Sequence, residues 1–147
     1  YFPQMRFVCS DELTDQELLA TLRRIQSLTA APEDLAHRFL YKAYGYQPLM
    51  ITNQCISQGY SGCSRKRMDF RDEKGNAFTA LSSCRDCYSV IYNGRCTTML
   101  DRLEEIGFED IMLDFTLESG KEVQQILDGT KAFFGNLTRG HHYKGID

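Results

Sequence analysis

The chain has 147 residues, which is enough for a hydrophobic core that needs no disulfide or metal to hold it together. Seventeen basic and twenty acidic residues give a net charge of −3, which argues against a surface that coats nucleic acid along its length. No apolar run reaches the roughly 18–20 residues of a membrane span, and no secretory signal is recognisable. We therefore expect a cytoplasmic protein with residues 1–147 as one domain. The start at Tyr1-Phe2-Pro3, without an initiator Met, predicts a fragment of a longer protein.

The first part of the chain predicts a strand, a helix and a second extended segment. Residues 5–10 form a short apolar run of strand type. Residues 14–26 have leucines at helical spacing behind a capping box of Thr14 and Glu17. Residues 27–40 are expected to form a loop with Pro32 at a helix start, or a short second helix. Residues 41–53 are aromatic and apolar and predict an extended segment.

The second part predicts a β-hairpin and then a return to alternating helices and strands. Residues 67–81 alternate in polarity around a turn at Lys74-Gly75-Asn76. A helix is expected at 97–107, with Met99, Leu100, Leu103 and Ile106 on one face. A strand at 110–117 and a helix at 119–134, opened by a capping box of Ser119 and Glu122, follow it.

This order of elements favours an α/β fold. Alternating strands and helices are typical of parallel sheets and barrels, but three such units cannot close an eight-stranded barrel. We therefore expect partial (β/α) barrel-type units with a cysteine-rich β-hairpin insertion at residues 53–96.

The cysteines of this insertion are the strongest chemical signal. Four of them bracket the hairpin, in two pairs: Cys55, Cys63, Cys84 and Cys87. Two thiolate pairs on either side of a turn are a common way to hold one metal, and either zinc or an iron–sulfur cluster suits four thiolates. A redox dithiol is disfavoured because the residues after Cys87 are poor helix formers. Cys96 is an alternative fourth ligand, and Cys9 is expected to be a buried strand residue.

Other patterns indicate weaker candidate sites. Six cysteines would suit three disulfides in an exported protein, but the only hint of export is a sequon at Asn136. Glu12 follows the first predicted strand, where a barrel protein holds a catalytic carboxylate or simply a helix-entry residue. A basic patch at the hairpin is either a solvated face or a site for an anionic substrate or RNA phosphates. It comprises Arg65, Lys66, Arg67 and Arg71. The segment with Arg139 and His141-His142 is interpreted as a solvated basic tail.

Four separated segments, in order, resemble the collagenase-like peptidases, peptidase family U32, in their long Firmicute-type bacterial form. They are "MRFVCSDELTDQEL", "YKAYGYQPLMITNQCISQGYSGC", "FRDEKGNAF…CRDCYSVIYN" and "IMLDFTLESGKEV…TRGHHYKGID". The resemblance covers nearly the whole chain apart from residues 27–40. It implies that the chain is the carboxy-terminal part of such a protein, and that the missing amino-terminal part is its partner.

The resemblance also implies a cofactor and a range of activities. The family is described as peptidases, a class of hydrolase. Better understood relatives use four cysteines to hold a 4Fe-4S cluster for oxygen-independent hydroxylation of ubiquinone precursors, or of transfer and ribosomal RNA. The corresponding ligands here are Cys55, Cys63, Cys84 and Cys87, with Cys96 as the alternative. The expected substrate is peptide or RNA, and the fragment could form an oligomer. The alternative function is a zinc-stabilised binding module that presents the basic hairpin to RNA, and a purely structural zinc site is the third.

Overall fold

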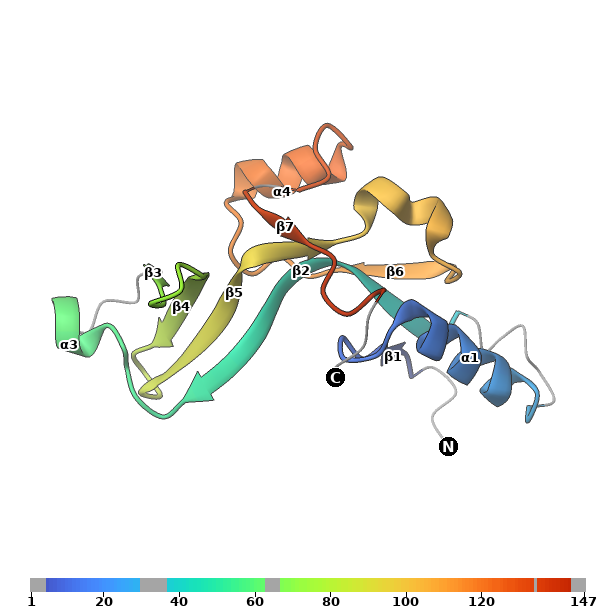
Figure 1. Ribbon diagram of the computed structural model, residues 1–147, viewed down its shortest axis with the longest axis horizontal. Helices are drawn as coiled ribbons and strands as arrows, with labels where there is room; N and C mark the ends of the chain where they lie inside the picture. The colour runs from blue at the N-terminus through green and yellow to red at the C-terminus, as the bar shows by residue number, and fades with distance from the viewer. Residues whose placement is uncertain (1–4, 30–36, 63–66, 134, 144–147) are drawn as a thin grey trace. The chain divides into compact units, whose positions relative to one another are not determined.

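A computed structural model describes residues 5–29, 37–62, 67–133 and 135–143 (Figure 1). Its fold is mixed α/β, with one seven-stranded sheet and few helices. The chain forms two compact units: a first unit of Tyr1–Gly45 with Thr97–Asp147, and a second unit of Tyr46–Cys96. None of the helices found in the described part of the chain has the length and apolar character needed to cross a membrane.

The elements follow one another with parallel and antiparallel strands in the same sheet. In chain order they are β1 (Phe7–Val8), α1 (Asp15–Gln26), β2 (Phe39–Thr52), α3 (Gln58–Ser61), β3 (Met68–Arg71), β4 (Ala77–Ser83), β5 (Tyr88–Thr98), the 3-10 helix η1 (Leu100–Glu105), β6 (Asp110–Leu113), α4 (Gly120–Leu127) and β7 (Leu137–Thr138). The strand order is β1-β2-β5-β4-β3, with β6 beside β2 and β7 beside β5.

The first unit is built on parallel strands covered by α1. Both β1 and β6 pair with β2 in parallel. The capping box of Thr14 and Glu17 begins α1, as the sequence predicts. In the first turn of this helix the Leu18 side chain points into the core. Leu18 packs there with Tyr41, Ala43 and Met99. Burial of a leucine of this kind stabilises the fold by about 2 kcal/mol relative to its exposure.

The second unit contains an antiparallel meander. β3 pairs with β4, and β4 pairs with β5 from Phe78↔Asn93 to Ser83↔Tyr88. The β3–β4 turn is the one predicted at 74–76. The Asp72 carboxylate fixes it by accepting hydrogen bonds from the backbone N–H groups of Lys74 and Asn76, at 2.9 and 2.8 Å. The β-hairpin predicted at residues 67–81 is therefore present as β3 and β4, whereas the structure does not confirm a cysteine-rich insertion at residues 53–96.

Two predicted helices and the barrel arrangement differ from the structure. The α-helix predicted at 97–107 is wrong: residues 97–98 stay in β5, and η1 is a short 3-10 helix interrupted by non-helical backbone angles at Arg102 (φ −141°, ψ 35°). Leu103, expected on its buried face, is 41% exposed. The helix predicted at 119–134 begins at its capping box but ends at Leu127, because Gly129 with φ +68° closes it.

The α/β class is confirmed at the level of a mixed sheet. β1 and β6 pair with β2 in parallel, whereas β3–β4 and β4–β5 pair antiparallel, so the expected barrel-type units are not confirmed in the described sheet. Of the segment expected as loop or second helix at 27–40, residues 30–36 lie outside the described residues, and residues 39–40 belong to β2.

Candidate functional site

The Cys84–Cys87 pair forms the turn between β4 and β5. Ser83 and Tyr88 are the last paired residues on either side of it, and the Ser83 hydroxyl donates to Asp86 at 3.0 Å. Cys87 has φ +53° and is the only described non-glycine residue in the left-handed region. That conformation costs on the order of 1 kcal/mol or more, and such strain concentrates at functional sites. The turn therefore holds Cys87 exposed at its end in a backbone conformation that few residues adopt.

Cys55 lies beside this turn because a buried serine ties its loop to the hairpin. Ser89 is fully buried on β5, and its hydroxyl donates to the Gln54 carbonyl at 2.9 Å. The same oxygen accepts the Ile56 N–H at 3.1 Å, and it lies 2.8 Å from the Ser82 hydroxyl. Since Ser89 has only one proton to give, Ser82 must be the donor in that last contact. The three bonds fix residues 54–56 against β4 and β5.

The surroundings of Cys55 favour the thiolate form of its side chain. The Ser57 hydroxyl lies 3.1 Å from Cys55 Sγ. This contact is the main reason why the pKa of Cys55 is lowered, and the Gln58 backbone N–H and the Ser82 and Cys84 side chains act in the same direction. The Cys84 side chain is thus one of the groups near Cys55 that favour its thiolate form. Thiolates are the form of cysteine that binds metals and attacks electrophiles.

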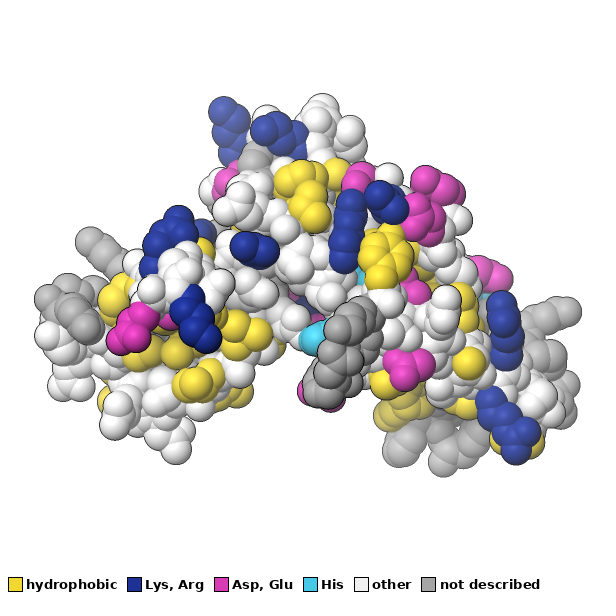
Figure 2. Space-filling view, viewed as in Figure 1, with side chains coloured by type: hydrophobic (Ala, Val, Ile, Leu, Met, Phe, Trp, Pro, Cys, Tyr) yellow, Lys and Arg dark blue, Asp and Glu magenta, His cyan; other side chains and the backbone are white. Residues whose placement is uncertain are grey.

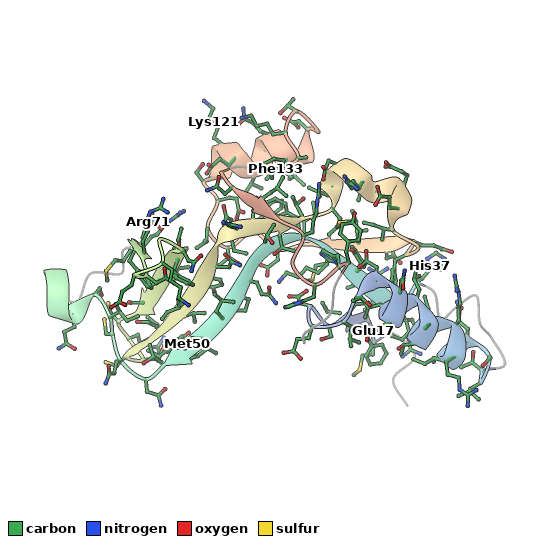
Figure 3. All side chains as sticks on the ribbon, viewed as in Figure 1. Glu17, His37, Met50, Arg71, Lys121 and Phe133 are labelled. Atoms are coloured by element: carbon green, nitrogen blue, oxygen red, sulfur yellow. The ribbon has the colours of Figure 1, made fainter. Side chains whose placement is uncertain are left out.

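A hollow of about 610 Å³ opens beside these thiols. Its described lining residues include no Asp, Glu, Lys, Arg or His: Asn53, Gln54, Cys55, Ile56, Gln58, Gly59 and Cys87. Two of the four predicted ligands, Cys55 and Cys87, therefore face one space in the second unit. Figure 3 shows the side chains of this region around the ends of β4 and β5.

The structure does not assemble the complete predicted ligand set. Cys63 lies outside the described residues, and no group of three or more metal-binding side chains is found within the ranges that are described. Cys96 is fully buried on β5, eight residues beyond Tyr88 and roughly 26 Å along the strand from the cysteine turn. That distance separates Cys96 from Cys84 and Cys87. Cys9 packs against the core of the first unit, and burial, with the Asp11 charge, raises its pKa to about 11.

Glu12, the predicted catalytic carboxylate, is exposed. The charged side chains that meet at the ends of the parallel strands are those of Asp11, Lys42 and Asp114. Lys42 on β2 lies 3.0 Å from Asp11, after β1, and 3.3 Å from Asp114, after β6. Burial alone would lower the Lys42 pKa, but the two carboxylates outweigh it and raise that pKa. Lys42 is therefore a fixed ammonium ion and not a free amine nucleophile.

The basic patch is only partly within the described residues. Arg65 and Lys66 lie outside them. Arg67 forms an ion pair with Asp69 at 2.9 Å, and Arg71 donates to the Gly75 carbonyl at 2.8 Å. Both described arginines of the patch thus have local partners on the hairpin.

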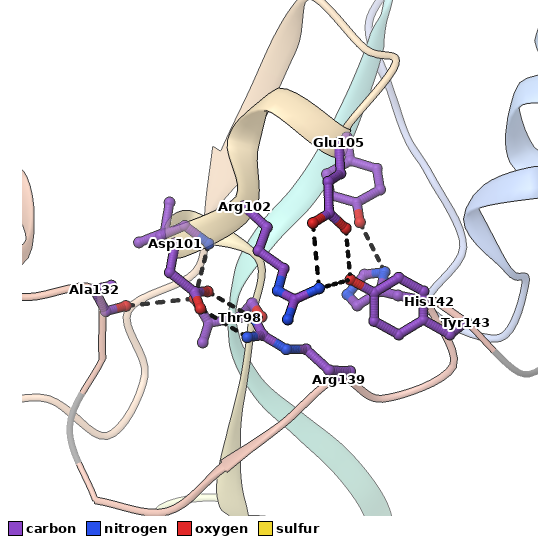
Figure 4. A network of polar contacts seen from close by, with 10 residues as sticks. Thr98, Asp101, Arg102, Glu105, Ala132, Arg139, His142 and Tyr143 are labelled. Carbon is purple, nitrogen blue, oxygen red and sulfur yellow. Dashed lines mark hydrogen bonds and ion pairs between the residues drawn. The ribbon is translucent and has the colours of Figure 1, made fainter.

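The carboxyl-terminal segment is not a solvated tail, contrary to the prediction. Arg139 makes a two-pronged ion pair with Asp101, both contacts at 2.7 Å (Figure 4). His142 is buried, and its Nδ1 lies 2.9 Å from Asp15 and 2.8 Å from the Tyr41 hydroxyl. Its Nε2 is buried, and among the described residues no hydrogen-bond partner for it is found. The prediction of a solvated tail was based on a run of adjacent basic residues. It failed because no sequence signal links residue 142 to α1 and β2, whose contacting residues lie more than a hundred positions away.

No sequence pattern assigned a role to Ser57, Ser82 or Ser89. Ser82 and Ser89 are a cross-strand pair in the β4–β5 register. A polar residue at an inward position of both strands is the signal that could have indicated them.

A comparison of this chain with models of protein families, with curated proteins and with solved structures finds no match.

Proposed function

We propose that the second unit is a thiolate metal module, in which Cys55, Cys63, Cys84 and Cys87 bind one iron–sulfur cluster or one zinc ion. The observation that carries the proposal is the hollow that Cys55 shares with Cys87, which lies in the same short β4–β5 turn as Cys84. The resemblance to peptidase family U32 extends the proposal to an enzyme of that kind, acting on peptide or by oxygen-independent hydroxylation.

The donor set fits a soft metal. Thiolates select zinc and iron–sulfur clusters over magnesium or calcium, which prefer oxygen ligands. A centre with four thiolates is anionic. Residues 46–96 carry seven basic and four acidic side chains, a net charge of +3 within a chain of −3. The positive charge of this unit would stabilise such a centre. A bound cluster would supply one-electron chemistry, whereas zinc would supply folding stability.

Metal content of matched cysteine variants tests the proposal. The chain is purified without oxygen and reconstituted with iron and sulfide, and its iron, zinc and visible absorbance are measured. We expect metal in the parent chain and in Cys96→Ala, and a loss of most of it in Cys55→Ala and Cys84→Ala. Equal metal content in Cys84→Ala would refute the ligand assignment. Iron with broad absorbance supports the enzyme, and zinc alone supports a structural centre.

RNA binding is the second candidate, and the positive charge of residues 46–96 favours it. A module that binds RNA phosphates has an affinity that falls linearly with salt on a logarithmic scale. We expect replacement of the four basic-patch residues by alanine to flatten that slope, by roughly 0.7 per lost contact on a single strand. Arg102→Ala, in the first unit, is the control. Fluorescence anisotropy with labelled single-stranded RNA measures the slope. An unchanged slope in the patch variant would exclude this function.

A further inference from the structure

The carboxyl half of β2 has an open edge. β1 pairs with β2 only at residues 39–40, and β6 pairs with it only at residues 40–44. Beyond these positions β5 is the only strand beside β2 in the described part of the chain. One edge of residues 47–52 therefore has no described strand against it. An open strand edge offers backbone donors and acceptors to another strand.

Three consecutive apolar side chains on this segment are exposed. Leu49 is 51% exposed, Met50 57% and Ile51 70%. Met50 lies near the carboxyl end of β2 (Figure 3), and hydrophobic side chains gather over this part of the sheet in the space-filling view (Figure 2). Exposure of three neighbours in a row means that apolar groups are uncovered on both faces of the strand, since successive side chains point to opposite faces.

No charge protects this edge. From Ala43 to Ser64 the sequence contains no acidic residue, no lysine, no arginine and no histidine. Protein edge strands commonly carry such charges, which oppose pairing with a second strand. Only Pro48, which lacks an N–H, restricts pairing here, and it lies at one end of the apolar group. The edge is thus open to a partner that is itself uncharged.

The segment is complementary to itself about Met50. In an antiparallel pairing of two copies centred on this residue, Met50 faces Met50 and Leu49 faces Ile51. The next pair is Pro48 with Thr52, and the amides of Gln47 and Asn53 face each other at the ends. A two-fold interface requires such a patch, because the same surface must meet its own copy. Aliphatic groups meet at the centre and polar groups at both ends.

We propose that residues 47–53 form a homodimer interface, in which the β2 edges of two copies pair antiparallel about Met50 and join their sheets. The partner is a second copy because the edge is uncharged and its apolar centre, Leu49 to Ile51, faces itself, although Pro48 has no N–H to donate to Thr52. The interface is small beside the about 20–30 residues a side of standard interfaces, and the dimer is accordingly weak and reversible. This inference does not depend on the metal module.

A charge-exchange pair of variants tests the register directly. Met50→Lys places two lysines against each other at the two-fold axis, and Met50→Glu places two glutamates there. We expect the parent chain to show a mass that rises with concentration from 16.9 kDa toward twice that value in analytical ultracentrifugation. We expect each variant alone to stay monomeric, and an equimolar mixture of the two to regain dimer. Leu127→Lys, on an exposed leucine of α4, is the control and should associate like the parent.

The mixture keeps the test valid even if a variant is less stable, because a misfolded chain is not rescued by the opposite charge. Circular dichroism of each variant confirms its fold. The proposal is overturned if the parent chain is monomeric at every concentration, if Met50→Lys dimerises like the parent, or if the mixture stays monomeric. Equal loss of dimer in Leu127→Lys would also overturn it, because the interface would then lie elsewhere.

Discussion

Replacement of Ser89 by alanine tests whether one hydroxyl holds the Cys55 loop on the hairpin. Ser89 is fully buried, and its hydroxyl makes three hydrogen bonds, with Gln54, Ile56 and Ser82. A hydrogen bond of this kind contributes about 1 kcal/mol net, and a buried partner left without its bond costs about 1–3 kcal/mol. Loss of all three should therefore weaken the attachment of the loop by about 3 kcal/mol.

Hydrogen exchange measures this effect where it occurs. The Ile56 N–H donates to Ser89, so its protection reports the attachment of the loop. A change of about 3 kcal/mol corresponds to roughly a hundredfold loss of protection, since 1.4 kcal/mol is tenfold. Ser83→Ala, which removes a bond at the exposed turn, is the matched control and should leave the Ile56 amide unchanged. A less than threefold loss in Ser89→Ala would show that the loop is held by other contacts.

Three further changes have defined outcomes. Gly94→Ala should lower the melting temperature strongly, because the added Cβ would lie 2.5 Å from the backbone carbonyl oxygen of Ala77. Gly59→Ala is the control and should leave the melting temperature unchanged, because its Cβ would meet nothing within 4 Å. Ser57→Ala should raise the pKa of Cys55, so that alkylation of this thiol slows at neutral pH and the rate–pH curve moves to higher pH; an unmoved curve would refute the role of the hydroxyl. Thr14→Ala should reduce the free energy of unfolding by about 1 kcal/mol in urea, and no change would show that the cap is dispensable.

Elements fixed by local chemistry could be predicted from the sequence. The two capping boxes open α1 and α4 at the expected residues, because Thr14 and Ser119 each satisfy backbone donors within one turn. The β3–β4 turn was predictable for a similar reason, since Asp72 bonds residues only two and four positions away. None of these features needs information from a distant part of the chain.

The helix predicted at 97–107 failed because tertiary pairing competes with its local pattern. Met99, expected on the helix face, donates its backbone N–H to the Ala43 carbonyl on β2 and is fully buried there. The preceding Thr98 stays in β5, and its hydroxyl accepts the Leu100 N–H at 3.2 Å. Too few residues then remain before Gly107 for a stable α-helix, which needs several turns or a packed face.

At the candidate site, the spacing of cysteines in the sequence predicts some positions, whereas others depend on how the strands and loops pair in the fold. Two cysteines two residues apart indicate a ligand pair without any knowledge of the fold, because the turn that joins them is local. The choice between Cys87 and Cys96 could not be made in this way, since it depends on whether the residues after the turn continue as a strand. They do, and each residue of an extended strand adds about 3.3 Å, which carries Cys96 away from the turn. Cys55, by contrast, reaches the turn only because Ser89, 34 positions later, bonds the loop on either side of it. The proposed ligand pair is thus placed by local sequence, whereas the position of Cys55, the proposed third ligand, depends on a long-range hydrogen bond that no spacing rule contains.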